Sequence, residues 1–194
     1  MRAKCSVFIA TSLDGYIARE DGRIDWLDQA NASIPPGEDC GYWEFISTVD
    51  TMVMGRRTFE QVLSFPEWPY GQTPVVVLSR GLKELPQGVL PSVSLSKESP
   101  EVLVARLSAG GSKHLYIDGG LTIQGFLDAG LIDEMTITRI PILIGQGKTL
   151  FGPVERDIPL EHITTHVYEF GFVQSMYRIV GKSEEGWETT DHTQ

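Results

Sequence analysis

Residues 114–127 change their hydrophobic period at two adjacent glycines, and this change restricts the possible folds more than any other feature of the chain. The apolar run 115–117 is typical of a short buried strand, whereas the apolar residues after Gly119 and Gly120 recur at helical spacing. Glycine adopts backbone angles closed to other residues, and a helix N-terminus offers unpaired N–H groups that suit a phosphate. The segment therefore predicts a strand, a turn and a helix. The turn either binds a phosphate or is a tight corner without a ligand.

Two other short apolar runs, 51–54 and 75–78, also end in polar residues. These are Gly55, Arg56, Arg57 and Thr58 after the first run, and Ser79 and Arg80 after the second. Arginine can bind a phosphate through two parallel hydrogen bonds, and parallel sheets bind ligands outside the carboxyl ends of their strands. The three strand ends together predict one anion site. The alternative is that the arginines are merely solvated.

The remaining patterns predict an α/β fold. Strand patterns cover 5–12 and 132–144, helical patterns cover 39–49 and 100–109, and the β-rich runs 163–170 and 173–180 are predicted to form a hairpin. We expect loops at 19–25 and 34–37 and a turn at 145–149. Strand-then-helix units followed by strands alone predict a mainly parallel mixed sheet with helices on both faces and an antiparallel C-terminal hairpin. One domain is expected over residues 1–181, with a disordered acidic tail over 182–194.

Composition excludes several classes of function. The net charge is −10, which argues against nucleic acid or an anionic membrane surface as a partner. Cys5 and Cys40 form no CxxC pair, and no Cys/His cluster has zinc spacing, so neither a disulfide framework nor a metal site is expected. No window approaches the roughly 18 apolar residues of a membrane span, and the N-terminus lacks the apolar core of a signal peptide. We therefore expect a cytoplasmic protein.

Five motifs in this order and spacing resemble a known superfamily. They are SLDGYIA (12–18), MGRRTF (54–59), VLSR (77–80), DGG (118–120) and PILIGQG (141–147). The chain is similar to the dihydrofolate-reductase-like superfamily. It most resembles the reductase (C-terminal) domain of the bacterial bifunctional riboflavin deaminase-reductase, over about residues 3–181.

The resemblance implies NADPH as the cofactor. The expected contacts are Gly55, Arg56, Arg57 and Thr58 with the pyrophosphate and 2′-phosphate, Ser79 and Arg80 beside the adenosine phosphate, Gly119 and Gly120 with the pyrophosphate, and Ala10 and Ile17 with the nicotinamide carboxamide. The chemistry of the residues agrees with this expectation, because a dianionic 2′-phosphate favours several nearby guanidinium groups. NADPH is therefore expected in preference to NADH.

The resemblance also implies residues on the substrate side. Asp39 matches the carboxylate that binds the pterin and assists protonation in dihydrofolate reductases, and Thr138 matches the threonine that supports it. Asp14 is a second acid near the nicotinamide. Each acid has a structural alternative, since Asp39 can cap the helix that follows it and Asp14 can fix the turn at Gly15.

The chain differs from both the bifunctional riboflavin enzyme and typical dihydrofolate reductases. It lacks the zinc-deaminase pattern of the bifunctional riboflavin enzyme, and an insertion containing Pro35 and Pro36 separates Trp26 from Asp39. We therefore expect a stand-alone NADPH-dependent reductase that acts on a small pterin- or pyrimidine-like substrate. It would resemble either dihydrofolate reductase or 5-amino-6-(5-phosphoribosylamino)uracil reductase. The alternative is a non-catalytic nucleotide-binding module, and the resemblance also suggests a homodimer.

Overall fold

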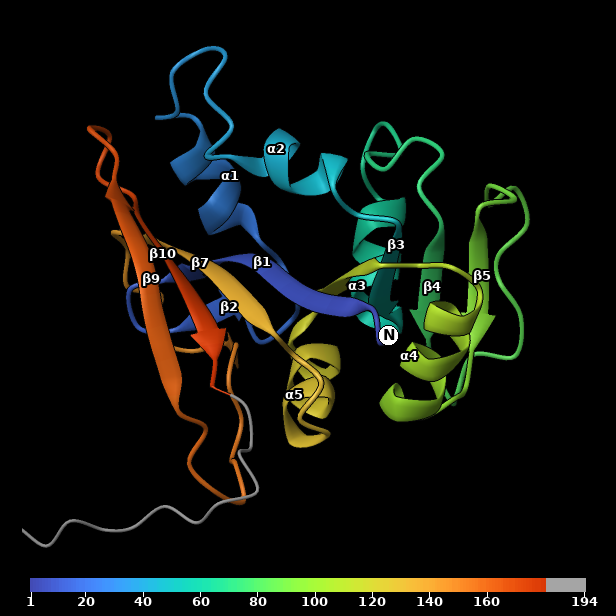
Figure 1. Ribbon diagram of the computed structural model, residues 1–194. Helices are drawn as coiled ribbons and strands as arrows, with labels where there is room; N and C mark the ends of the chain where they lie inside the picture. Colours follow the sequence, from blue (N-terminus) through green and yellow to red (C-terminus); the bar gives the residue numbers. More distant parts are fainter. Residues whose placement is uncertain (181–194) are drawn as a thin grey trace, which may run out of the picture.

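The computed structural model describes residues 1–180, which form an eight-stranded sheet with helices on both faces (Figure 1). The strand order is β5-β4-β3-β6-β1-β7-β10-β9. The strands of this sheet are β1 (Lys4–Ser12), β3 (Thr51–Gly55), β4 (Val75–Leu78), β5 (Val93–Ser96), β6 (His114–Asp118), β7 (Glu134–Ile140), β9 (Leu160–Val167) and β10 (Val173–Ile179). The predicted tail over 182–194 lies outside the described residues.

Strand directions follow the prediction of a mainly parallel mixed sheet. The six strands from β5 to β7 in the sheet order are joined by parallel pairings. β10 runs antiparallel to both β7 and β9, and it forms the C-terminal hairpin with β9. The predicted fold class is confirmed. Parallel pairing brings the carboxyl ends of β4, β3, β6 and β1 to one edge of the sheet, where a ligand can contact all of them.

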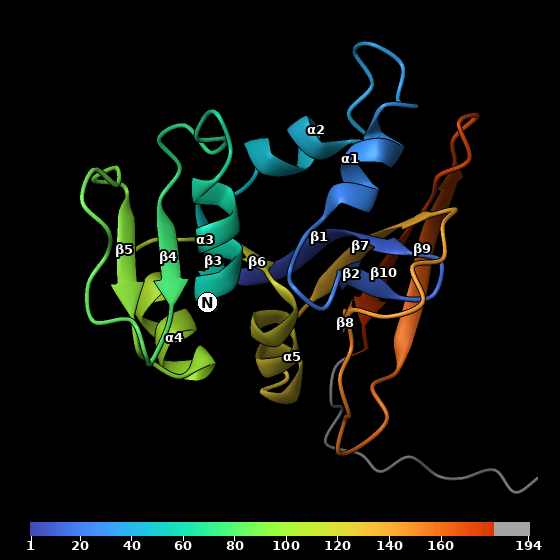
Figure 2. The same cartoon turned by 180° about the vertical axis from the view of Figure 1, so that it is seen from behind.

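Five helices connect the strands in the described part of the chain. They are α1 (Asp25–Asn31), α2 (Tyr42–Ser47), α3 (Arg56–Leu63), α4 (Pro100–Ala109) and α5 (Gly120–Asp128). Figure 2 shows α4 and α5 at one side of the sheet and α1 and α2 at the other. None of these helices is long and apolar enough to cross a bilayer.

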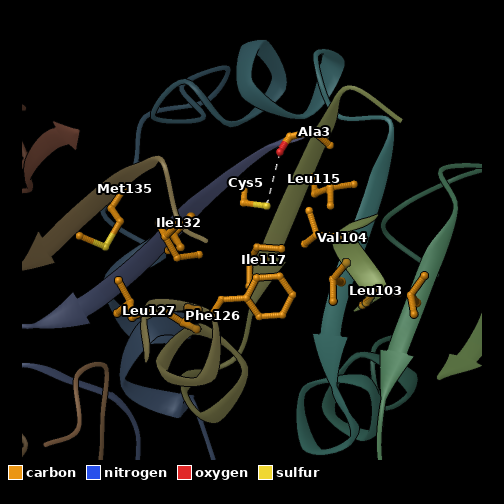
Figure 3. Close-up of a cluster of buried hydrophobic side chains, with 14 of the residues drawn as sticks. Ala3, Cys5, Leu103, Val104, Leu115, Ile117, Phe126, Leu127, Ile132 and Met135 are labelled. Carbon is orange, nitrogen blue, oxygen red and sulfur yellow. Dashed lines mark hydrogen bonds between the residues drawn. The ribbon is translucent and has the colours of Figure 1, made fainter. Parts of the chain in front are cut away.

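Alternate residues of β6 enter different cores, because successive side chains of a strand point to opposite faces. Leu115 and Ile117 pack with residues of α4 and α5, and this core includes Phe126 (Figure 3). Tyr116 packs instead with Phe59 of α3 and with the aromatic residues of α2. Both cores pack against the same central strand, so the position of its carboxyl end is well determined.

Four elements differ from the sequence prediction. Residues 25–31 form α1, although the sequence predicted a loop up to residue 25 and no element after it. The helix forms here because the fully buried Trp26 packs into a third core. The expected turn at 145–149 contributes β8 (Lys148–Thr149), which pairs antiparallel with β2 (Tyr16–Ala18), a strand that directly precedes the loop expected at 19–25. Neither short strand has a local pattern of its own. The expected helix over 39–49 is shorter in the structure, at Tyr42–Ser47.

Candidate functional site

The N-termini of α3 and α5 touch at the carboxyl edge of the sheet. α3 begins directly after β3, and α5 begins two residues after β6, the neighbouring strand. A Cβ on Gly55 would lie 2.7 Å from Oγ1 of Thr122, and a Cβ on Gly119 would overlap Oγ1 of Thr58. Close contact between the two helix ends therefore depends on glycine at both positions.

Both helix ends lack side-chain caps in the described chain. Neither α3 nor α5 has a side-chain hydrogen bond at its N-cap or an acidic residue in its first turn. In α4, by contrast, Ser99 accepts a hydrogen bond from a backbone N–H at the cap and Glu101 lies in the first turn. Unpaired N–H groups carry partial positive charge, so two adjacent uncapped ends form a site suited to an anion.

The three arginines predicted from the sequence follow neighbouring strands, β3 and β4, at the same edge of the sheet. Arg56 and Arg57 open α3 and are exposed, and Arg56 makes a long ion pair with Glu60 at 3.6 Å. Arg80 follows β4, the other neighbour of β3, and is also exposed. Ser79 is used locally, since its hydroxyl accepts a hydrogen bond from the N–H of Leu82 at 3.0 Å. Strand adjacency thus brings the predicted anion-binding residues to one edge.

The residues predicted beside the nicotinamide lie next to this site. Ile17 of β2 packs against Gly120, where an added Cβ would lie 2.8 Å from Cδ1 of Ile17. Ala10 is half-buried in β1, the strand on the other side of β6 from β3. The edge therefore continues from the helix ends toward β1 and β2.

Asp14 ties two loops together. Its Oδ1 accepts a hydrogen bond from the Ser12 hydroxyl at 2.6 Å, and its Oδ2 accepts from the backbone N–H groups of Gly145 at 2.8 Å and Ile144 at 3.2 Å. These donors, the Ser12 hydroxyl first, lower the pKa of the Asp14 carboxyl. Both oxygens of this exposed carboxylate thus accept hydrogen bonds from the protein, and the carboxylate joins the turn after β1 to the segment after β7.

Asp39 makes the helix-capping contacts that were the structural alternative. Its Oδ1 accepts from the N–H of Gly41 at 2.9 Å, and its Oδ2 accepts from the N–H of Trp43 at 2.7 Å. Thr138 is buried, and its hydroxyl accepts from Nε2 of Gln174 at 2.9 Å. The same Nε2 donates to the carbonyl of Cys40 at 2.9 Å. Within residues 1–180, Thr138 is thus linked to the segment around Asp39 through Gln174 and not by a direct hydrogen bond to Asp39.

A third acid, Asp118, received no role from the sequence beyond its place in the DGG motif. It is the last residue of β6 and is half-buried, and its Oδ1 accepts from the N–H of Gly119 at 2.8 Å. Burial raises the pKa of Asp118 to about 6, although the Gly119 N–H opposes this shift. The sequence pattern that could have drawn attention to Asp118 is an acidic residue at the end of an apolar strand, directly before two glycines.

Comparison with known proteins identifies the family. The model of the RibD C-terminal domain matches residues 3–171, which is most of the chain. The chain belongs to the RibD C-terminal domain family. This confirms the resemblance seen in the sequence motifs.

Relatives of this RibD C-terminal domain protein cover nearly all of its length. It is 37% identical over 163 residues to the uncharacterized protein YwjB of Bacillus subtilis, which covers 82% of this chain and 89% of that protein. A putative riboflavin biosynthesis protein from Shewanella sp. PV-4 superposes with a TM-score of 0.86 and 45% identity, over 93% of this chain and 100% of that one. Dihydrofolate reductase from Enterococcus faecalis, complexed with NADP(H), shares the fold with a TM-score of 0.58 and 20% identity, over 92% and 98% of the chains. The family and its fold support a reductase-type function with a small-molecule substrate.

Proposed function

We propose that this protein is an NADPH-dependent reductase that transfers a hydride to a small pterin- or pyrimidine-like substrate. The observation that carries the proposal is the contact between the two uncapped helix ends of α3 and α5, with Arg56 and Arg57 beside them. The solved structure of the dihydrofolate reductase that shares the fold is a complex with NADP(H), which supports the same class of cofactor here.

The residues present fit a dinucleotide at this edge. Gly55 and Gly119 allow the ends of α3 and α5 to meet in direct contact, since a Cβ at either position would collide with a threonine of the other helix, and the N–H groups of these two ends would hold the pyrophosphate. Arg57 and Arg80 are exposed at neighbouring strand ends and would hold the 2′-phosphate, which NADH lacks. Ile17 and Ala10 would flank the nicotinamide, which supplies the hydride when the cofactor is bound.

The test compares the two cofactors by thermal unfolding. A ligand at 100 times its Kd stabilises the folded state by about 2.7 kcal/mol, so a clear rise in Tm is expected with NADPH and a smaller one with NADH. Equal and negligible shifts with both cofactors would disprove the proposal. NADPH oxidation is then measured with dihydrofolate and with 5-amino-6-(5-phosphoribosylamino)uracil. Stabilisation without turnover across a broad panel of such substrates would support the non-catalytic nucleotide-binding module instead.

We also propose a homodimer that forms through β9. This strand is the outer edge of the sheet, and all eight of its residues are exposed, including Leu160, Ile163 and Val167. It contains neither proline nor lysine, which protect many natural edge strands. In an antiparallel pairing of two β9 strands, Leu160 would oppose Val167 and Glu161 would oppose His166, so that apolar residues and hydrogen-bonding partners meet.

Light scattering coupled to size exclusion tests the dimer. The wild-type chain should elute as a dimer, and Ile163→Lys should shift it to a monomer without changing NADPH binding. A wild-type monomer at micromolar concentrations would overturn this part of the proposal.

The buried, unpaired thiols of Cys5 and Cys40 suit a reducing compartment, and we propose the cytoplasm as the location.

A further inference from the structure

The face of the sheet that α1 and α2 cover is the place for a substrate next to the cofactor. Ala10 of β1 is in register with Thr138 of β7, and Thr138 is in register with Gln174 of β10. Side chains in register on neighbouring strands point to the same face, so these three lie side by side. Ala10 is proposed to flank the nicotinamide, so a substrate that accepts the hydride lies over the same strands. The surface around these three residues is named the substrate face below.

Two acids lie at one border of the substrate face. Nε2 of Gln174 donates to Oγ1 of Thr138 and to the carbonyl of Cys40, each at 2.9 Å, and this holds the chain before α2 beside the face. A carboxylate oxygen of Glu38 accepts from the N–H of Cys40 at 2.7 Å, and Asp39 caps α2. Hydrogen bonds to the backbone therefore fix two negative charges at this border.

An acid and aromatic rings lie at the border formed by β6. Tyr116 is in register with Ser6, which points to the same face of β1 as Ala10 because an even number of residues separates them. Asp118 lies two residues after Tyr116 and points to this face as well. The ring of Tyr42, from α2, packs against the same core as Tyr116. The charge at this border is thus also negative.

The segment that covers the substrate face carries no positive charge. Residues 25–47, which comprise α1, α2 and the connection between them, contain no lysine, arginine or histidine. The charged residues of this segment are all acids, namely Asp25, Asp28, Glu38, Asp39 and Glu44. An anionic ligand below this segment would therefore meet charges of its own sign.

The nearby arginines face elsewhere or are paired. Arg56, Arg57 and Arg80 follow β3 and β4, where they are proposed to hold the cofactor. Arg139 comes directly after Thr138 in β7 and so points to the opposite face of the sheet. Three further arginines form ion pairs with acids, namely Arg19 with Asp25, Arg23 with Asp21, and Arg178 with Glu134 and Glu161. Within residues 1–180, the substrate face thus has no unpaired arginine or lysine.

Tyrosine side chains at both borders respond to the acids. Burial, followed by the charge of Asp118, raises the pKa of Tyr42 to about 12. Burial is also the largest cause that raises the pKa of Tyr168 to about 12, and the charges of Glu38 and Asp39 add to it. Among the described residues, no lysine or arginine contributes to either shift. The electrostatic potential at the substrate face is therefore negative.

We propose that the substrate is a neutral pterin- or pyrimidine-like ring compound that carries neither a phosphate nor a carboxylate group. This inference rests on the proposed function. Groups of like charge brought together weaken binding, and no cation on this face offsets the charge of an anionic tail. The ring of Tyr42 and the uncharged polar groups of Thr138 and Gln174 suit a flat ring with neutral substituents. The phosphates of the cofactor have separate partners at the ends of α3 and α5.

The proposal discriminates between compounds that share a ring system. 5-Amino-6-(5-phosphoribosylamino)uracil carries a phosphate, whereas 5-amino-6-ribosylaminouracil is the same compound without it. Dihydrofolate carries a glutamate tail with carboxylates, whereas 7,8-dihydrobiopterin has a short neutral side chain. In each pair, the neutral member is expected to bind more tightly.

Calorimetry with these two pairs tests the proposal on the wild-type protein. The complex with NADP⁺ is used, because the oxidised cofactor cannot donate a hydride and binding is measured without turnover. At about 10 mM ionic strength, where the Debye length is about 30 Å, the neutral member of each pair should bind at least about 10-fold more tightly. Equal or tighter binding of the anionic member in either pair would overturn the proposal.

Salt dependence separates charge from shape. At about 100 mM ionic strength the Debye length falls to about 10 Å, so the anionic members should bind more tightly than at low salt, and the neutral members should be unaffected. A preference that does not change with salt would mean that shape excludes the anionic compounds, and would also overturn the proposal.

Glu38→Gln adds a matched test, because glutamine keeps an oxygen that can accept the Cys40 N–H but removes the charge. The anionic members should bind about two- to fivefold more tightly to this variant, as expected for the loss of one partly exposed charge. Glu101→Gln, on α4 at the other side of the sheet, is the control and should bind all four compounds like the wild type. Unchanged anion binding in Glu38→Gln would contradict the electrostatic basis of the proposal.

The failure of this inference is distinguishable from the failure of the proposed function. If NADPH stabilises the protein but neither neutral compound binds the NADP⁺ complex, the inferred substrate class is wrong and the reductase proposal stands. If neither cofactor binds, the proposed function fails as well.

Discussion

Gly119 and Thr58 lie so close together that a Cβ at position 119 would overlap the Thr58 hydroxyl oxygen, and Gly119 also has a φ of 91°. Gly119→Ala should therefore lower the free energy of unfolding by about 2–4 kcal/mol, as measured by urea denaturation, and abolish NADPH binding. Gly111→Ala is the control, since Gly111 has a φ of 99° but nothing within 4 Å of its Cβ position. The free energy of unfolding of Gly111→Ala should fall by only about 1 kcal/mol. Equal losses in the two variants would show that the contact with Thr58 does not matter.

Arg57 is exposed at the first turn of α3, whereas Arg56 is partly engaged by Glu60. Arg57→Ala should weaken NADPH binding by about 10-fold or more and leave NADH binding unchanged, because only NADPH carries the 2′-phosphate. Fluorescence titration with both cofactors measures the two affinities. Arg156→Ala, which removes an exposed arginine between β8 and β9, should change neither. A parallel loss of NADPH and NADH affinity in Arg57→Ala would place Arg57 on the pyrophosphate.

The Asp14 carboxylate joins the turn after β1 to the backbone of Ile144 and Gly145. Asp14→Ala should free the turn next to Ile17, so that limited proteolysis cuts residues 13–18 faster and NADPH binds more weakly. Asp21→Ala, which removes an exposed carboxylate paired with Arg23 in the neighbouring loop, is the control. Unchanged proteolysis and unchanged cofactor affinity in Asp14→Ala would refute this role.

His114 should make stability depend on pH in the weakly acidic range. Its ring contacts Oγ of Ser6 at 2.8 Å and the carbonyl of Thr48 at 3.2 Å, and burial, followed by the charge of Lys4, lowers its pKa below the usual 6.5. The folded state thus favours the neutral ring, and the unfolded chain binds the proton more readily. Stability from this source is fully present above about pH 6.5 and is lost as the pH falls toward the lowered pKa.

Urea denaturation between pH 7.5 and 5.5 measures this effect. As the pH falls from 7.5 to 5.5, the free energy of unfolding should decrease by up to about 1 kcal/mol more in the wild-type chain than in His114→Asn. Identical pH dependence in wild type and His114→Asn would contradict the prediction.

Asp118 should make stability depend on pH in the opposite direction to His114. Its pKa is raised from 3.8 to about 6, so the folded state favours the protonated acid, and this source of stability is lost as the pH rises through about 6. Asp118→Asn should therefore raise the free energy of unfolding at pH 8 by up to about 2 kcal/mol and have little effect at pH 4, where both side chains are neutral. Chemical denaturation at the two pH values measures the difference. A loss of stability at pH 8 would mean that the ionised carboxylate has a favourable partner.

Several elements could be predicted because their signals are local. α4 has the predicted bounds, Pro100–Ala109, since Ser99 caps its first turn and Pro100 suits the first helical position. The β6 strand and the α5 helix likewise follow from the change of period at the diglycine. The strand-end residues proposed to bind the anion could be grouped from the sequence, because parallel strands bring their carboxyl ends to one edge of the sheet.

Other features depend on partners distant in sequence. β2 and β8 are too short to show a pattern, and each exists because the other pairs with it across about 130 residues. Asp14 finds its backbone donors at Ile144 and Gly145, which no local pattern around Asp14 reveals. α1 forms because Trp26 is buried in the third core, although its sequence carries weak helix signals.

The sequence by itself determined the fold class and the family, since hydrophobic periods, glycines and strand-end arginines act within a few residues of one another. Only the tertiary structure decided how the acids of the site are used. Both oxygens of Asp14 and of Asp39 accept hydrogen bonds from the protein, whereas Asp118, among the described residues, accepts one, from the Gly119 N–H, and lies near the phenols of Tyr42 and Tyr70. The pKa of a carboxylate depends on its burial as well as on its hydrogen-bond partners, and burial is set by segments that only folding brings together.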